Sequence, residues 1–247
     1  MKVALLADLH ANLEALAACL GHAEAHGTDR WAFIGDIVGY GADPQAVTDI
    51  VMAYAATGAT VVLGNHDAAA IGLGSENMNE QAEAAIRWTR GKLSNAHKEF
   101  LATLPLTVRD DGILFVHASA AAPDRWIYVS DPLRAAHSIS ASGATYVFSG
   151  HVHVPVLYFQ GTDARPQPFR PVPGVPIPVP RHRRWLAIVG SCGQPRDGNP
   201  AACYALLDTD RAELTFFRLP YDHFITARKI RAAGLPEKLA LRIEQGR

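Results

Sequence analysis

Five short segments of the sequence concentrate side chains that bind metal ions. Their carboxylate oxygens, amide oxygen and imidazole nitrogens suit Mn²⁺, Fe or Zn²⁺. The sequence has no cluster of cysteines of the kind that a thiolate zinc site or an iron–sulfur cluster requires. The segments are Asp8-Leu9-His10, Gly35-Asp36, Gly64-Asn65-His66-Asp67, His117 and Gly150-His151-Val152-His153.

Each segment directly follows a short apolar run that predicts a strand. These runs cover residues 3–7, 31–34, 60–63, 113–116 and 145–148. Because ligands bind at the carboxyl ends of strands in an α/β sheet, we expect the five segments to meet at one sheet edge. Glycines at positions 35, 64 and 150 permit the sharp backbone turns that direct a ligand back over a strand end.

Helical patterns alternate with these strands through the first two-thirds of the chain. We expect helices at residues 13–27, 44–56 and 132–141, and two more within residues 79–102. Asp43, Asn79 and Ser94 are candidate N-caps. A further strand at 106–109 precedes the turn at 110–112. The alternation predicts an α/β sandwich with a sheet between helical layers.

The pattern changes after His153. Strands at 154–160, 185–190, 203–208 and 213–219 have few helices between them, which predicts largely antiparallel pairing. A segment at about 163–184 is rich in arginine and has seven prolines between residues 166 and 180, so it cannot be a central strand. Two helices, near 222–232 and 236–245, close the chain. We expect one domain over residues 1–247.

Composition excludes some classes of protein. The formal net charge is −1, which gives no electrostatic reason to expect nucleic acid or an anionic membrane as an obligatory partner. Three cysteines in a chain of 247 residues indicate reduced thiols. The apolar run before Asp8 is too short for a signal peptide or a membrane span, so we expect a cytoplasmic protein. The oligomeric state cannot be read from the sequence.

The order of the five motifs resembles the calcineurin-like metallophosphoesterase superfamily, from Met1 to about Asp208. The strings at 8–12, 35–41 and 193–200 are similar to its small bacterial members, the YfcE-like phosphodiesterases. The resemblance implies a four-layer α/β/β/α sandwich with mixed sheets.

The resemblance also implies a site of two metal ions. One ion takes Asp8, His10 and His153, the other takes Asn65, His117 and His151, and Asp36 bridges both. Two cations about 3.5–4 Å apart clamp a phosphoryl group and activate a bridging hydroxide, which attacks phosphorus. His66 would stabilise the phosphate or protonate the leaving oxygen. Arg196 and Asn12 are predicted to contact the substrate.

The sequence departs from one branch of the superfamily. The protein serine/threonine phosphatases carry an acidic residue and an arginine three and four positions after the motif aspartate, where this chain has Gly39 and Tyr40. The partner that would orient His66 and one phosphate-binding arginine are therefore missing, which argues against a protein phosphatase. Another departure is Ile188-Val189, where small bacterial members often have Asn-Pro.

Several alternatives remain open from the sequence. The leading hypothesis is hydrolysis of a small phosphorylated substrate, first of all a phosphodiester, with nucleotides as candidates. The alternatives are a dinucleoside polyphosphate, a phosphomonoester, or a non-catalytic scaffold of the same fold. The loop at 119–128 is either a wall for an aromatic group or packing against the sheet. The arginines at 181–184, with Arg165 and Arg170, form either a basic lid or a solvated loop.

Overall fold

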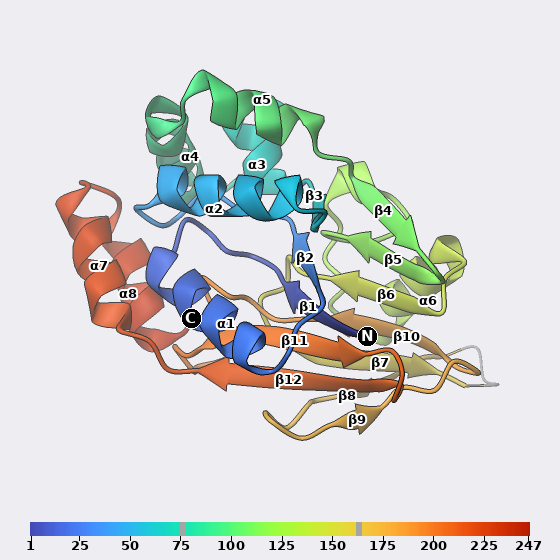
Figure 1. The fold of residues 1–247 in the computed structure, drawn as a ribbon. Helices are drawn as coiled ribbons and strands as arrows, with labels where there is room; N and C mark the ends of the chain where they lie inside the picture. The colour runs from blue at the N-terminus through green and yellow to red at the C-terminus, as the bar shows by residue number, and fades with distance from the viewer. Residues whose placement is uncertain (75–77, 162–164) are drawn as a thin grey trace.

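Two six-stranded mixed sheets stack against each other in the computed structural model, which describes residues 1–74, 78–161 and 165–247 (Figure 1). The strand order is β3-β2-β1-β11-β12-β9 in the first sheet and β4-β5-β6-β10-β7-β8 in the second. In the first sheet, β1, β2 and β3 are parallel, and in the second β5, β6 and β10 are parallel. The remaining pairs are antiparallel.

The described residues form twelve strands and eight α-helices. The strands are β1 (Lys2–Leu6), β2 (Arg30–Ile34), β3 (Thr60–Val62), β4 (Thr107–Asp110), β5 (Ile113–Val116), β6 (Tyr146–Ser149), β7 (Val156–Gln160), β8 (Gln167–Phe169), β9 (Ile177–Pro178), β10 (Arg184–Ile188), β11 (Ala202–Asp208) and β12 (Glu213–Leu219). The helices are α1 (Leu13–Ala25), α2 (Pro44–Ala56), α3 (Asn65–Ala70), α4 (Glu80–Lys92), α5 (Asn95–Thr103), α6 (Pro132–Ser142), α7 (His223–Ala232) and α8 (Glu237–Gln245).

Three apolar layers hold the sandwich together. Alternate residues of β1 face opposite ways: Leu5 packs between the two sheets with Phe148 and Trp185, whereas Leu6 packs under the helices with Leu16. The outer face of the second sheet is covered by α6. Because β1 is buried on both faces, its sequence is a continuous apolar run rather than an alternating one. This is the predicted four-layer α/β/β/α arrangement.

The structure differs from the sequence prediction in three places. Helix α3 was not predicted; it begins at Asn65, directly after β3. The proline-rich segment contributes β8 and β9, each at the edge of a sheet, where a missing backbone N–H does least damage. The expected side-chain cap by Asp43 is wrong, because the Asp43 carboxylate accepts a hydrogen bond from Lys229 instead.

The C-terminal helices are tied to the loop that follows β1. Asn12 caps α1, with its side-chain oxygen accepting from the Ala15 N–H and the Thr226 hydroxyl, each at 3.1 Å. Its amide nitrogen donates to the Gly193 carbonyl at 2.7 Å and to the Tyr221 hydroxyl at 3.0 Å. The buried Asn12 side chain therefore joins three distant parts of the chain.

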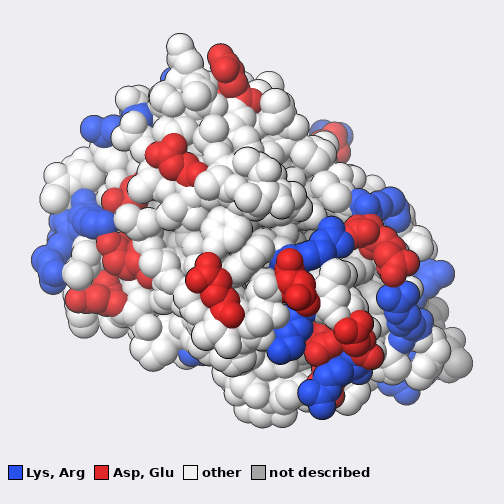
Figure 2. Space-filling view, in the orientation of Figure 1, with Lys and Arg blue, Asp and Glu red and all other residues white. Residues whose placement is uncertain are grey.

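No helix in the described ranges is long and apolar enough to cross a membrane. Figure 2 shows acidic and basic side chains interspersed on the face seen in Figure 1, without a broad field of one sign on that face.

Replacing Asn12 with alanine is expected to lower the free energy of unfolding by about 2 to 4 kcal/mol, because one helix cap is lost and several buried polar groups lose partners. Asn79→Ala is the matched control. Within the described residues, the Asn79 side chain makes one hydrogen bond, in which it accepts from the Ala82 N–H and so caps α4. That change should cost about 1 kcal/mol. Urea denaturation measures both, and equal losses would contradict the bracing role of Asn12.

Candidate metal centre

The five ligand-bearing segments lie at the carboxyl ends of β1, β2, β3, β5 and β6, and the structure brings their side chains together. The predicted single sheet edge is wrong, because β1, β2 and β3 belong to one sheet and β5 and β6 to the other, so the segments meet where the two stacked sheets end side by side. Ligand atoms of Asp8, His10, Asp36 and His153 lie within 4.8 Å of one another. Ligand atoms of Asp36, His117 and His151 form a second group within the same limit. Asp36 is common to both groups.

Asn65 joins the second group through its side-chain oxygen, which lies 3.2 Å from His117 Nε2. All seven predicted ligands therefore lie in one cluster. The structure groups Asp8, His10 and His153 on one side of Asp36 and Asn65, His117 and His151 on the other.

Each histidine ligand is oriented by a backbone carbonyl. His10, His117 and His153 donate from Nδ1 to the carbonyls of Val38, Ile34 and Gln194, at 3.3, 2.8 and 2.6 Å. Since a carbonyl only accepts, Nδ1 carries a proton in each ring and Nε2 faces the cluster. His151 is reversed: its Nε2 donates to the Trp126 carbonyl at 2.9 Å, which leaves Nδ1 for a metal.

The backbone that carries the ligands is held in an unfavourable conformation. Asp8, His10, Asp36, His151 and His153 all have positive φ, between 48° and 66°. For residues other than glycine this costs about 1–2 kcal/mol each. Hydrogen bonds between loops maintain it, because the loop after β1 donates three N–H groups to carbonyls of the loop after β2. Strain concentrated at these positions is typical of functional sites.

Glycines beside the ligands are needed for space as much as for turns. Gly35 has a φ of +75°, as predicted, and a Cβ there would also lie 2.7 Å from His117 Nδ1. Gly64 and Gly150 do not have positive φ, so the predicted role in turning the chain is wrong for them. A Cβ on Gly150 would lie 2.7 Å from the Asp8 carboxylate, and one on Gly64 would overlap the backbone of Asp36.

The two buried carboxylates, Asp8 and Asp36, lack enough positive charge around them. Burial raises the pKa of Asp8 to about 7. Burial alone would also raise the pKa of Asp36, but the charge of His117 holds it well below its usual range. For His117, burial acts to lower the pKa, and Asp36 raises it to about 10. Among the described residues, only histidines pair with the two carboxylates at salt-bridge distance.

The donor set fits two transition-metal ions. Two carboxylates, an amide oxygen and four correctly oriented imidazole nitrogens are the ligands that Mn²⁺, Fe and Zn²⁺ accept. Bound cations would also supply the positive charge that the buried carboxylates lack. The geometry does not select one metal over another.

His66 lies beside the cluster but does not face it as a ligand. Its ring, 4% exposed, packs 4.9 Å from the His10 ring and 4.4 Å from the Tyr40 ring. Its Nδ1 has no hydrogen-bond partner among the described residues, and a Cβ on Gly39 would overlap this atom. The glycine at position 39 predicts that His66 lacks an acidic side chain to orient it. Within the described structure, no acidic side chain accepts a hydrogen bond from His66 Nδ1.

Arg196 lies at the edge of the cluster, as predicted. Its guanidinium is 5.7 Å from the centre of the Tyr40 ring and donates two hydrogen bonds to the Gln194 side chain, at 2.9 and 3.3 Å. Its positive charge acts on the pKa values of Asp8, His10 and His66. Arg196 thus places a positive charge beside the cluster.

Two other sequence hypotheses fare differently. Asn12 is fully buried, and its side-chain amide already donates to Gly193 and Tyr221. Its substrate-binding role stays a prediction, and the structure shows no free donor on Asn12 to support it. The basic lid is not supported. Arg181 pairs with Asp111, in the β4–β5 turn, and Arg183 covers the Phe159 ring. Both precede β10, whose opposite end faces the cluster.

Three supporting residues were missed in the sequence. The Asp67 carboxylate accepts the N–H groups of Val38 and Gly64, at 3.1 and 3.0 Å, and so ties the second motif to the third. The Ser191 hydroxyl donates to the Asp8 carbonyl, and the Gln194 carbonyl orients His153. Asp67 stands inside the third motif and Gln194 inside the string 193–200, whereas Ser191 has no signal apart from following a strand.

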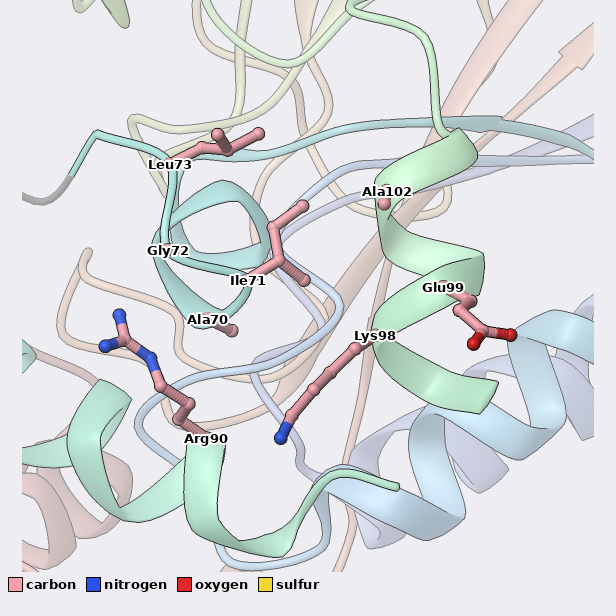
Figure 3. Close-up of a pocket in the computed structure, with 8 residues that line it drawn as sticks. All are labelled: Ala70, Ile71, Gly72, Leu73, Arg90, Lys98, Glu99 and Ala102. Atoms are coloured by element: carbon pink, nitrogen blue, oxygen red, sulfur yellow. The ribbon is translucent and has the colours of Figure 1, made fainter. Parts of the chain in front are cut away.

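Two cavities differ in their relation to the site. A cavity of about 130 Å³ is bordered by Asn65 and His151, so it opens beside the cluster. Figure 3 shows a larger cavity of about 580 Å³ that no predicted ligand lines. Its lining comes from the end of α3 and from α4 and α5: Ala70, Ile71, Gly72, Leu73, Arg90, Lys98, Glu99 and Ala102.

Comparison with known proteins identifies the family. The calcineurin-like phosphoesterase superfamily domain matches residues 1–212, and the chain belongs to this superfamily. An uncharacterised protein of Methanocaldococcus jannaschii is 30% identical over 99% of this chain and 98% of its own length. The chain is therefore a metallophosphoesterase by family, with buried Asp and His groups that suit a dinuclear metal site.

Solved structures agree with the fold. A metallophosphoesterase from Sphaerobacter thermophilus is 36% identical and superposes with a TM-score of 0.90 over 100% of this chain and 99% of its own. A hypothetical protein of Pyrococcus horikoshii shares the fold, with 20% identity and a TM-score of 0.79 over 100% and 98%. The E. coli phosphoesterase Yfce is only distantly similar, at 16% identity and a TM-score of 0.45. The superfamily is established and the YfcE-like branch is not.

Metal affinity is expected to rise with pH. Without a cation, Asp8 and His117 hold protons at pKa values of about 7 and 10, so binding near pH 6 must displace both. Affinity for Mn²⁺ should increase about tenfold per pH unit for each displaced proton, and less steeply once the pH exceeds 7. Calorimetric titration at pH 6, 7 and 8, in buffers of different ionisation enthalpy, measures affinity and protons released.

Two variants control this titration. Asp36→Asn should weaken binding at both positions, whereas Asp111→Asn, on an exposed turn far from the cluster, should leave it unchanged. Affinity that does not vary between pH 6 and 8 would contradict the assignment of Asp8 and His117 as ligands.

Proposed function

We propose that the protein is a dinuclear-metal hydrolase that cleaves phosphate esters, with phosphodiesters as the preferred substrates. The observation that carries the proposal is the shared Asp36: two ligand sets that meet at one carboxylate are the arrangement needed to hold two cations side by side. When bound, such cations activate water and neutralise charge that develops on a phosphoryl group. Membership of the superfamily supports the same reaction class.

Side chains around the cluster have distinct tasks in this proposal. Arg196 binds a phosphate oxygen and holds the substrate against the metal centre. His66 donates a hydrogen bond from its ring to the phosphate or the leaving oxygen. Burial lowers the pKa of His66 to about 4, with Asp36 opposing, so the neutral ring predominates at neutral pH. A neutral imidazole favours a hydrogen-bonding role over a full general acid.

The charge around the cluster favours diesters over monoesters. A phosphodiester carries one negative charge, whereas a phosphomonoester carries about −1.5 to −2 at pH 7. The protein serine/threonine phosphatases of this superfamily have an arginine at the position of Tyr40, and here the guanidinium over that ring comes from Arg196. One arginine at this place suits a monoanion.

The alternatives are separable by experiment. A dinucleoside polyphosphate hydrolase would cleave anhydrides in preference to esters, and a phosphomonoesterase would prefer p-nitrophenyl phosphate. A non-catalytic scaffold would cleave none of them. Against the scaffold, this chain retains His66 and all seven predicted ligands in one cluster.

With Mn²⁺ supplied, the protein is expected to hydrolyse bis-p-nitrophenyl phosphate faster than p-nitrophenyl phosphate. Asp36→Asn should reduce kcat at least 100-fold, because both metal positions lose a shared ligand. Release of p-nitrophenolate measures both substrates, and metal analysis confirms loading. Turnover of the monoester alone would overturn the diester preference. No turnover by metal-loaded protein, with a dinucleoside polyphosphate also intact, would favour the scaffold.

Replacing Arg196 with alanine is expected to lower kcat/KM for the diester by about 10- to 100-fold, the loss of one charge-assisted phosphate contact. Arg196→Lys should retain part of the activity, since it keeps the charge but not the paired donors. Arg181→Ala is the control, because Arg181 pairs with Asp111 away from the cluster, and it should leave kcat/KM unchanged. Equal losses in Arg181→Ala and Arg196→Ala would restore the basic-lid hypothesis.

A further inference from the structure

The cavity of about 130 Å³ beside the metal centre is walled by aromatic and apolar side chains. Its lining includes two of the predicted metal ligands, Asn65 and His151, together with Trp126, Tyr128 and Met78. Arg125 adds a cation at the same place. A pocket with aromatic lining in direct contact with the predicted ligands is positioned to receive part of the substrate.

The aromatic walls are fixed to the metal centre itself. The Tyr128 ring stacks on the His151 ring at 3.9 Å between centroids, with 24° between planes. Trp126 lies in the left-handed region with φ of 52°, and its carbonyl accepts the hydrogen bond from His151 Nε2. Arg134 of α6 donates to the Tyr128 carbonyl at 3.1 Å. The pocket is therefore formed before any substrate arrives.

Tyr128 lines the pocket and also lies near the cation proposed to bind phosphate. Arg196 lies close enough to Tyr128 and Tyr40 to act on the pKa of both phenols. Tyr128 is 47% exposed, so its ring is accessible to a ligand. A phosphate held by Arg196 and the centre would thus have one of its ester groups next to the Tyr128 and Trp126 rings.

We propose that this cavity is a binding subsite for a single aromatic ring, carried by one ester group of the substrate. The inference rests on the proposed function, because it assigns the ring to a substituent of the cleaved phosphate. Stacking on Tyr128 and Trp126 supplies recognition that tolerates variation in ring chemistry. Volume sets the size limit, since a cavity of about 150 Å³ holds one benzene ring. Two fused rings exceed the space.

Binding of product-like monoesters to the Mn²⁺-loaded protein tests the subsite without requiring turnover. Phenyl phosphate and cyclohexyl phosphate have the same charge and similar size, and only the first has an aromatic ring. Calorimetry should give a Kd for phenyl phosphate roughly fivefold to tenfold lower. 1-Naphthyl phosphate should bind no more tightly than phenyl phosphate, because its second ring does not fit.

Variants of Tyr128 decide the cause of the preference. Tyr128→Ala should reduce the phenyl-to-cyclohexyl ratio to about one, while Tyr128→Phe keeps the ring and should keep the ratio. Since Tyr128 stacks on His151, the Mn²⁺ content of each variant is measured alongside. A ratio near one in the unmodified protein, or one unchanged in Tyr128→Ala with full Mn²⁺ content, overturns the subsite.

The source of the ring is resolved by one more ligand. Thymidine 5′-phosphate carries a six-membered ring one sugar away from the phosphate. If Tyr128→Ala weakens its binding, the natural ring belongs to a nucleoside ester. If Tyr128→Ala weakens only the binding of phenyl phosphate, the ring belongs to an aryl ester.

Failure of the proposed function is distinguishable from failure of this subsite. Loss of ester hydrolysis with the ring preference intact rejects the first alone, whereas hydrolysis without the preference rejects the second alone.

Discussion

The structure depends on the burial of two carboxylates, Asp8 and Asp36, which are 0% and 1% exposed. Removing a charged carboxylate from water costs several kcal/mol unless compensating charge is supplied. Neither carboxylate has a lysine or arginine ion pair within the described structure, and their partners are imidazoles. Bound cations would therefore supply the charge that the cluster lacks. The surrounding fold must also withstand the repulsion between the two carboxylates and the backbone strain at the ligands.

Hydrogen bonds between loops, rather than any single helix or strand, keep the ligands in place against this repulsion and strain. Asp67 fastens the loop after β2 to the start of α3, and Ser191 fastens the loop after β10 to Asp8. The C-terminal pair α7 and α8, beyond the residues 1–212 that match the superfamily domain, extends this bracing. Lys229 of α7 reaches Glu14 and Asp43, the residues just after the first two motifs. The C-terminal helices thus stabilise the site without contributing a ligand.

Part of the clustering of the candidate ligands follows from a simple rule. A polar residue directly after a parallel strand lies at the edge where the strands of its own sheet end, so the sequence could place Asp8 beside Asp36. His117 follows β5 of the other sheet, and its position beside them depends on how the two sheets stack. Supporting contacts follow no such rule. Gln194 orients His153 across 41 positions of sequence, and Asn12 meets Thr226 across 214. These pairings depend on packing of the complete fold, as does the placement of Arg181 at the end of β10 opposite to the site.

Gly39 and Tyr40 stand where the protein serine/threonine phosphatases have an acidic residue and an arginine, and both affect His66. Glycine at 39 leaves room for the His66 ring, since a Cβ would overlap its Nδ1, and it also removes the carboxylate that would raise the pKa of His66. Tyr40 fills the space of the missing arginine by packing on His10 and His66, and it supports the guanidinium of Arg196 from another loop. In the proposed function, the positive charge that meets the phosphate is retained but comes from Arg196, in the loop after β10, and burial shifts His66 toward its neutral form. The proposed phosphodiester, with its single negative charge, is the substrate that this pair of side chains would suit.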